Sequence, residues 1–327
     1  MASNSLLLAL AAVFCLPGVS AHPANLSNWS IIEARAYALV DNYNAGNFFS
    51  EFNFYTGADP THGYVDYQSQ SNAQSQGLIN TNNNQVYLGV DTTSYKPPNG
   101  RASVRVSSNK AYTHGLFIAD IAHMPGDLCG IWPAWWLFGP NWPSSGEIDV
   151  IEGVNLAGTD QITLHTSSGC IVNTAGSQPG TTLLNEDCNS GNGNNGCAVS
   201  TSATNAYGDS FNGNGGGVYA MQWASSGIYV WFFPRNAIPQ DIQNDAPVTT
   251  DWGLPTVAFN GGSGCDIDAH FQNENIVFDT TFCGDWAGNS WSGSCAALAD
   301  TCVDYVAQNG GAFGQGYWSI NSVKVYQ

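Results

Sequence analysis

Three acidic residues in the segment Gly146–Glu152 constrain the fold more than any other feature of this chain. The segment reads Gly-Glu-Ile-Asp-Val-Ile-Glu, and its β-branched residues favour a strand. Because strand side chains alternate between faces, Glu147 and Asp149 share one face and Glu152 points to the other. One extra residue near Val150–Ile151, a β-bulge, would return Glu152 to the face of the other two acids. We therefore predict a bulged strand with three carboxylates on one side.

Crowded carboxylates need a chemical reason, because like charges repel and the burial of a charge is costly. Hydrolysis of a glycosidic bond with retention uses two carboxyl groups about 5 Å apart. One attacks the anomeric carbon, and the other protonates the leaving oxygen and later activates water. A third carboxylate can hold the nucleophile and keep the proton donor protonated. A solvated acidic edge and a calcium site are the alternative interpretations of this segment.

The wider segment resembles the catalytic block of glycoside hydrolase family 16, and it is most similar to fungal laminarinase-like endo-β-1,3(4)-glucanases. The block consists of Trp132–Trp136, Asn141–Pro143 and Gly146–Asn155. Segments elsewhere in the chain are similar to the same enzymes: Phe54–Val65, Ser103–Arg105, Trp231–Arg235 and Phe282–Gly288. Together these blocks cover most of the chain after its first residues.

The resemblance implies a two-sheet, concanavalin-like jelly roll and a retaining endo-β-glucanase acting on β-1,3-glucans, mixed β-1,3/1,4-glucans or both. It assigns Glu147 as the nucleophile, Glu152 as the general acid/base and Asp149 as the residue that positions Glu147. The order of the two Glu roles comes from the resemblance, since spacing alone does not assign it. A glucan transglycosylase and a non-catalytic β-glucan-binding lectin are the alternatives.

Aromatic rings suit sugar binding, because they offer a large contact area to the apolar C–H faces of a pyranose. By the resemblance, Trp135 and Trp142 match sugar-contacting positions, whereas Trp132, which precedes Pro133, is expected to pack. Trp286 is expected to contribute from another loop.

Two cationic or titratable side chains join this set. By the resemblance, His165 lies beside the carboxylates, where its imidazole can hydrogen-bond the helper acid or a sugar hydroxyl. Arg105 alternates with Val104 and Val106 and can donate to a sugar hydroxyl, with an ordinary surface arginine as the alternative.

The rest of the sequence reads as short strands separated by turns, which predicts an all-β antiparallel sandwich. The predicted strands are Phe48–Phe54, Ser103–Ser107, Gln161–His165, Val218–Trp223, Ile228–Phe233, Ile276–Phe278 and Trp318–Gln327. One short helix is predicted within Cys295–Gln308. The Asn-, Gly- and Ser-rich segment Asn185–Gly217 is expected to be a long loop tied down by Cys188 and Cys197.

Residues 1–21 read as a secretory signal peptide, which leaves one catalytic domain over residues 22–327. The eight cysteines after this segment predict four disulfides, with the pairing left open. Sequons at Asn25 and Asn28 predict glycosylation. We therefore expect a secreted, extracellular monomer without a membrane anchor.

Charge excludes some partners, because 7 Lys and Arg against 25 Asp and Glu give a net charge of −18. This balance disfavours nucleic acid and suits a neutral polysaccharide, here a β-glucan. No metal and no cofactor are expected, since the cysteine spacing does not fit zinc and no dinucleotide-binding glycine motif leads into a helix.

Overall fold

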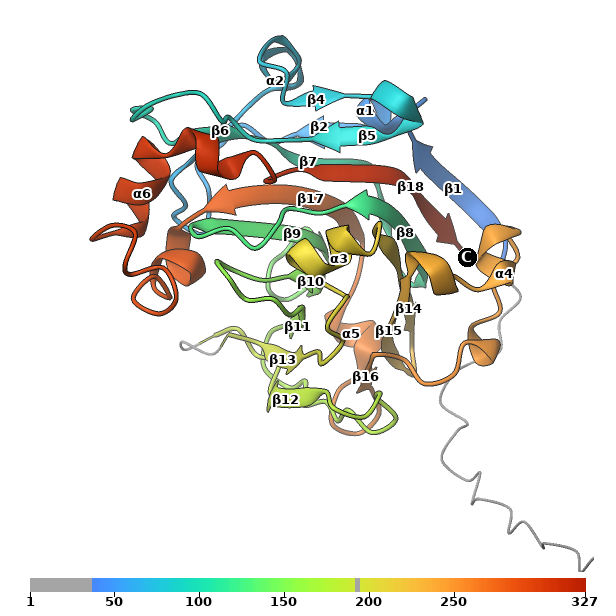
Figure 1. The fold of residues 1–327 in the computed structure, drawn as a ribbon. Helices are drawn as coiled ribbons and strands as arrows, with labels where there is room; N and C mark the ends of the chain where they lie inside the picture. The colour runs from blue at the N-terminus through green and yellow to red at the C-terminus, as the bar shows by residue number, and fades with distance from the viewer. Residues whose placement is uncertain (1–36, 192–194) are drawn as a thin grey trace, which may run out of the picture. The chain divides into compact units, whose positions relative to one another are not determined.

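Two antiparallel β-sheets form the framework of the computed structural model, which describes residues 37–191 and 195–327 (Figure 1). Within these residues, each sheet has eight strands. Sheet 1 has the order β16 (Val257–Asn260), β15 (Gly227–Pro234), β14 (Gly217–Ala224), β8 (Gly115–His123), β18 (Trp318–Tyr326), β5 (Val86–Leu88) and β4 (Ile79–Asn80), with β1 (Leu39–Asn44) also paired to β18. Sheet 2 has the order β12 (Thr182–Asn185), β13 (Cys197–Ser200), β11 (Gln161–His165), β10 (Glu147–Glu152), β9 (Ile131–Phe138), β17 (Glu274–Phe282), β7 (Arg105–Tyr112) and β2 (Phe52–Phe54).

The remaining elements are short and connect or flank the sheets. A two-stranded parallel pair consists of β3 (Val65–Tyr67) and β6 (Arg101–Ser103). The α-helices are α1 (Phe48–Glu51), α2 (Gln70–Ser75), α3 (Gly208–Gly213), α4 (Gln240–Gln243), α5 (Ile267–His270) and α6 (Cys302–Gln308). Single turns of other helix types are η1 (Asn82–Asn84), η2 (Arg235–Ala237), η3 (Thr249–Asp251), η4 (Gly284–Gly288) and η5 (Gly310–Phe313). No helix in the described part of the chain is both long and apolar enough to cross a membrane.

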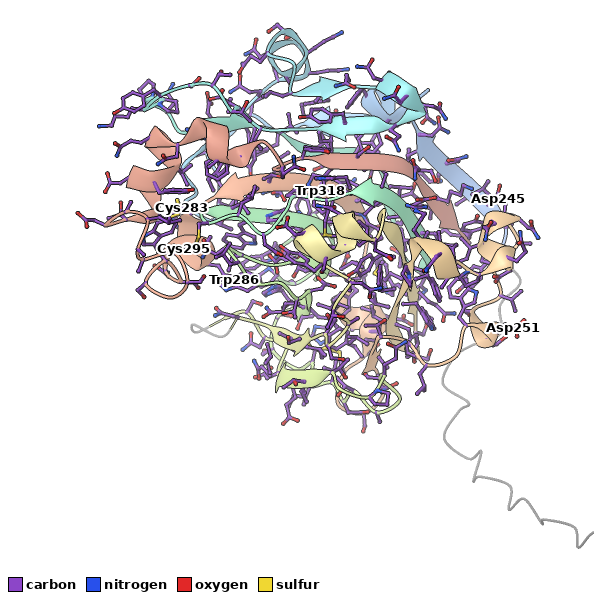
Figure 2. The ribbon with its side chains drawn as sticks, viewed as in Figure 1. Asp245, Asp251, Cys283, Trp286, Cys295 and Trp318 are labelled. Carbon is purple, nitrogen blue, oxygen red and sulfur yellow. A yellow bond between two sulfur atoms is a disulfide. The ribbon has the colours of Figure 1, made fainter. Side chains whose placement is uncertain are left out.

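The hydrophobic core lies between the two sheets and fixes which face of sheet 2 is free. Ile148, Val150 and Ile151 of β10 are completely buried in it. Burial of each such side chain stabilises the fold by roughly 1.5–3 kcal/mol. Trp318 of sheet 1 crosses this core (Figure 2), and its indole N–H donates to the backbone oxygen of Asp279 at 3.1 Å. The opposite face of sheet 2 therefore remains for polar side chains.

Strand β10 contains the predicted bulge. Asp149 pairs with Trp136 of β9, but the next residue paired with β9 is Ile151, opposite Trp135. Val150 is therefore the extra residue, and the pairing continues with Glu152 opposite Ala134. Both Val150 and Ile151 point into the core, which restores Glu152 to the face of Glu147 and Asp149.

The two-sheet jelly-roll sandwich, the final strand and the hairpin between β14 and β15 are confirmed. Three local predictions are wrong. Phe48–Glu51 forms α1, so the strand predicted from Phe48 begins only at Phe52. The helix predicted from Cys295 begins only at Cys302, because Thr301 caps its first turn by accepting from Asp304 N. The segment after Asn185 is not one long loop, since it contains β13 and α3.

Four disulfides join the eight cysteines among the described residues, as predicted. The pairs are Cys129–Cys295, Cys170–Cys265, Cys188–Cys197 and Cys283–Cys302. The pair Cys188–Cys197 ties down the Asn- and Gly-rich segment, as expected. The predicted signal peptide, Asn25 and Asn28 lie outside the described residues.

Candidate active site

The bulge places Glu147, Asp149 and Glu152 on the outer face of sheet 2, where all three line one cavity of about 520 Å³. His165 of β11 lies opposite Glu147 in the strand register, and its Nε2 is 3.8 Å from Glu147 Oε1 and 3.2 Å from Asp149 Oδ2. The His165 ring is fixed from behind, because its Nδ1 lies 2.8 Å from Ser190 Oγ.

Burial and mutual repulsion keep protons on this group of acids. Burial, followed by the charge of Asp149, raises the pKa of Glu147 to about 8. Burial, followed by the charge of Asp279, holds the pKa of Asp149 well above its usual range. Burial and Asp149 do the same for Glu152. The three carboxyl groups therefore do not all ionise together near neutral pH.

The surroundings of the two glutamates differ in how many groups favour their charged form. His165, a hydrogen bond from Trp142 and Arg105 all oppose the rise in the pKa of Glu147. For Glu152, two groups oppose the rise in pKa: the Trp132 indole, whose Nε1 donates to Glu152 Oε1 at 2.8 Å, and the charge of His165. More of these groups favour the negatively charged form of Glu147 than that of Glu152.

A second cavity of about 530 Å³ adjoins the first. Both cavities are lined by Trp132, Glu152, His165, Asn195 and Asp285. Glu147 lines only the first, together with Arg105 and Trp142, whereas Trp286 and Leu184 line the second. Glu152 therefore lies at the junction of a cleft that extends to both sides of it.

Trp286 reaches this cleft from η4, directly after Cys283. Figure 2 shows Trp286 at the same end of the molecule as Cys283 and Cys295, both of which belong to one buried cluster. The Cys283–Cys302 disulfide anchors the start of this segment, and the Trp286 ring meets the Trp132 ring edge to face at 5.6 Å.

Arg105 and Trp142 also lie in the cleft, as their predicted roles require. The Arg105 guanidinium sits 4.7 Å from the centre of the Trp136 ring and 5.1 Å from that of Tyr55. Trp142 is 52% exposed, which leaves much of its ring free for contact.

The prediction for Trp135 is wrong. Its side chain is completely buried in the core, where it stacks on Phe278 at 6.0 Å. The physical reason is strand alternation, because Trp132 and Trp136 point to the cleft and Trp135 therefore points away from it. Trp132, which was expected to pack, packs against Trp286 and in addition lines both cavities and donates a hydrogen bond to Glu152.

Asp279 is a further carboxyl group in the cleft that the sequence analysis missed. It lies on β17 beside β9, accepts from Tyr67 Oη at 3.2 Å and Trp136 Nε1 at 3.3 Å, and has a pKa that burial raises to about 6. Its signal in the sequence was an acid directly after the apolar run Ile276–Phe278.

Glu147, Asp149 and His165 also have the composition of a cation site, since one ligand atom of each lies within 4.8 Å of the others. Within this group, the charge of Asp149 raises the pKa of Glu147 and the charge of His165 opposes that rise.

The chain is therefore a β-sandwich protein whose outer face carries a cleft lined by several carboxyl groups and aromatic rings. The family described as "XgeA-like, catalytic GH16 domain" matches residues 52–326. The chain belongs to glycoside hydrolase family 16.

Relatives with assigned names agree with this family. A probable endo-1,3(4)-beta-glucanase of Aspergillus fumigatus is 44% identical over 339 residues, which cover 100% of this chain and 50% of the relative. The endo-1,3(4)-beta-glucanase of Arthroderma benhamiae is 44% identical over 89% of this chain and 65% of its own length. The chain thus spans about half the length of the first of these relatives.

Two solved structures are similar in both sequence and fold. Laminarinase 16A from Phanerochaete chrysosporium, described with 6-O-glucosyl-laminaritriose in donor and acceptor sites, has a TM-score of 0.83 and 43% identity, covering 90% of this chain and 100% of that chain. An elongating GH family 16 beta-1,3-glucosyltransferase has a TM-score of 0.84 and 42% identity, covering 89% and 100%.

Proposed function

We propose that this chain is the catalytic domain of a secreted, retaining endo-β-glucanase that hydrolyses β-1,3-glucans, mixed β-1,3/1,4-glucans or both. The observation that carries the proposal is the bulge at Val150, which gathers Glu147, Asp149 and Glu152 on one face of β10. The names of the relatives support the substrate class.

The reaction is a double displacement. A carboxylate oxygen of Glu147 bonds to the anomeric carbon, while the Glu152 carboxyl gives its proton to the departing glycosidic oxygen. Glu152 is then a carboxylate, and it takes a proton from a water molecule whose oxygen attacks the same carbon and releases Glu147. A hydrogen bond between Asp149 and Glu147 holds Glu147 in place, and when Glu147 is the attacking carboxylate, Asp149 carries the hydrogen of this bond. Whenever Asp149 is ionised instead, its charge favours the protonated form of Glu152.

The two adjoining cavities support cleavage inside a chain. The sugar attacked by Glu147 would lie in the first cavity, and the leaving part of the glucan would lie in the second, beside Trp286 and Trp132. A cleft with room on both sides of Glu152 accepts an internal linkage. Because its walls carry aromatic rings and few cations, a neutral polysaccharide is the fitting ligand.

Chemical rescue tests the roles of the two glutamates. With a 2,4-dinitrophenyl β-laminaribioside as substrate, Glu147→Ala in azide is expected to give the α-glycosyl azide, because azide replaces the nucleophile. Glu152→Ala is expected to give the β-azide, because azide replaces activated water at the glycosyl-enzyme. The reverse stereochemistry would exchange the two roles, and no rescue of either variant would overturn the proposal.

A glucan transglycosylase is the second candidate, and the 42% identity to a beta-1,3-glucosyltransferase favours it. It would use the same glycosyl-enzyme, with a sugar hydroxyl in place of water. Product lengths from laminarin with and without added laminaribiose separate the two. Products longer than the substrate at low acceptor concentration would favour the transferase.

A further inference from the structure

Asp160 is a completely buried carboxyl group directly behind the proposed acid/base. It precedes β11, and its Oδ1 accepts the backbone N–H of Glu152 at 3.0 Å. Its Oδ2 lies 3.1 Å from the hydroxyl oxygen of Tyr219, which belongs to β14 of sheet 1. The backbone of Asp160 is itself fixed, since its carbonyl oxygen accepts from Thr201 N at 3.0 Å and Thr201 Oγ1 at 3.2 Å. The side chain thus connects the end of β10 to the opposite sheet.

The bulge explains why Glu152 needs this contact. The pairing of β10 with β11 ends at Asp149, opposite Thr163, although β10 continues to Glu152. Beyond Asp149, the Asp160 carboxyl therefore supplies an acceptor where β11 no longer pairs. A buried backbone N–H without an acceptor destabilises the fold, so this contact selects one backbone position for Glu152.

Counting hydrogens indicates the protonation state of Asp160. The Tyr219 hydroxyl has one hydrogen but two oxygen neighbours, Asp160 Oδ2 at 3.1 Å and the Ala206 carbonyl oxygen at 2.7 Å. A carbonyl oxygen cannot donate, so the Tyr219 hydrogen belongs on the shorter contact to Ala206. The contact with Asp160 is then a hydrogen bond only if Asp160 Oδ2 carries a hydrogen and donates to Tyr219.

The environment supports that assignment. Burial raises the pKa of Asp160 to about 8, although hydrogen bonds with the backbone of Glu152, the Tyr219 hydroxyl and the backbone of Gln161 oppose the rise. Within the described part of the chain, the groups that hydrogen-bond the Asp160 carboxyl belong to Glu152, Tyr219 and Gln161, and none of them is a cation.

We propose that Asp160 is a positioning residue, held as a neutral carboxylic acid, that fixes the backbone of Glu152 and so aims the Glu152 side chain at the leaving oxygen. The proposal rests on the proposed function of Glu152 as general acid/base. Asp160 does not line either cavity and acts only through Glu152.

Two substitutions of Asp160 test whether its hydrogen bonds, rather than its charge, position Glu152. Asp160→Asn keeps an oxygen to accept from Glu152 N–H and supplies an amide N–H for Tyr219, so it reproduces the neutral acid. Asp160→Ala removes the acceptor and leaves Glu152 free to shift. Since a displacement of about 1 Å at a reacting group can cost ~10²-fold in rate, Asp160→Ala is expected to lose about that factor in kcat/KM on laminarin.

The test compares laminarin with 2,4-dinitrophenyl β-laminaribioside in the presence of azide. The aryl substrate needs no proton donor and azide needs no base, so this reaction bypasses Glu152. Asp160→Ala is expected to lose about 10²-fold on laminarin but to stay close to wild type on the aryl substrate with azide. Asp160→Asn is expected to stay close to wild type on both.

Asn260→Ala is the matched control for general destabilisation. Asn260 is a buried polar residue of sheet 1 whose Nδ2 donates to the backbone oxygens of Asn173 and Ala175. This variant is expected to lower the melting temperature without changing the ratio of the two activities. An equal loss by Asp160→Ala on both substrates, or no loss on laminarin, would overturn the positioning role.

Infrared difference spectroscopy decides the protonation state, even if Asp160→Ala does not fold. Wild type minus Asp160→Asn at pH 6 is expected to show the C=O band of a protonated carboxyl group. A carboxylate band instead would overturn the neutral acid. Failure of the proposed function is seen separately, because Glu152→Ala would then yield no β-azide whatever Asp160 does.

Discussion

Acidic residues on the outer faces of the two sheets have opposite environments: those near sheet 1 pair with cations, and those on sheet 2 are buried beside other acids. On sheet 1, Asp120 lies 2.7 Å from Arg235 Nη2, and Asp245 forms an ion pair with Lys324 of β18. The hydrogen bond from Lys324 lowers the pKa of Asp245. On sheet 2, burial and the charge of Asp149 hold the pKa of Glu152 well above its usual range, even with His165 nearby.

The difference shows what distinguishes a reactive acid from a structural one in this molecule. An exposed acid beside a cation stays ionised and adds little to stability. A buried acid beside other acids keeps a proton that it can give away, at a cost to the folded state. Substitutions on the two faces should therefore change different properties, activity on sheet 2 and only slight stability on sheet 1.

The largest expected effect is that of Glu147→Gln. It removes the nucleophile, so kcat/KM on laminarin is expected to fall by about 10⁴-fold or more, beyond the usual range for loss of a general acid/base. Asp120→Asn on sheet 1 is the control and should stay near wild type. Reducing-end release from laminarin measures both. Equal activity of the two variants would erase the contrast between the sheets.

Asp149→Asn should have a smaller effect with a defined direction in pH. The charge of Asp149 raises the pKa of both Glu147 and Glu152. Its removal lowers both, so the alkaline limb of kcat/KM, where Glu152 loses its proton, is expected to move to lower pH. The rate at the optimum should fall by about 10–100-fold, because Glu152 is less often protonated once the Asp149 charge is gone. Movement of the alkaline limb to higher pH would contradict this electrostatic account.

The sequence alone was sufficient to predict that the three acids of β10 share one face, because their spacing requires one extra residue in the strand. Intervals of two and three residues in a strand fit one face only if one residue is extra, and Val150 is that residue. The sandwich was predictable for a similar reason, since short strands between turns repeat along the whole chain.

Other parts of the site depend on contacts that local spacing does not contain. Asp279 and Asp160 join the catalytic group through strand order and through a contact with the opposite sheet. Trp135 was misassigned because its neighbours Trp132 and Trp136 are equally aromatic, and only the register with the bulge shows which rings face the core. The helical turn at Phe48 was missed because its aromatic residues also suit a strand.

Glu274 extends the comparison to stability. This glutamate of β17 is completely buried, and its carboxyl oxygens have no hydrogen-bond partner within residues 37–191 and 195–327. Burial, followed by the charges of Glu147 and Asp149, holds its pKa well above its usual range. The folded state therefore binds the proton more tightly than the unfolded state. Its stabilising effect is complete below the unfolded pKa of about 4.3 and is lost as pH rises toward the folded pKa.

Glu274→Met, an apolar replacement of similar size, should remove this loss. The variant is expected to be more stable than wild type by about 1–3 kcal/mol at pH 8, with a smaller difference at pH 5. Urea unfolding at the two pH values measures it. A variant that is less stable than wild type at pH 8 would show that the Glu274 carboxyl has a stabilising partner.

The smallest expected effect is that of Asp245→Asn, in the turn after α4, whose partner Lys324 belongs to sheet 1. Because the folded pKa of Asp245 is lowered, its ion pair with Lys324 stabilises the fold above the unfolded pKa of about 3.9 and ceases to do so as pH falls through the folded value. The pair is largely exposed, so the loss at pH 7 should be at most about 1 kcal/mol and should shrink in 1 M salt. The stability difference between the variant and wild type should thus grow as pH rises from the folded pKa of Asp245 to about 3.9. The wild type loses stability at Glu274 in a different window, which begins at about pH 4.3 and extends upward. If both variants changed stability in the same direction as pH rises, the two faces would not differ in how they hold their acids, and the link between buried, unpaired carboxyl groups and reactivity would fail.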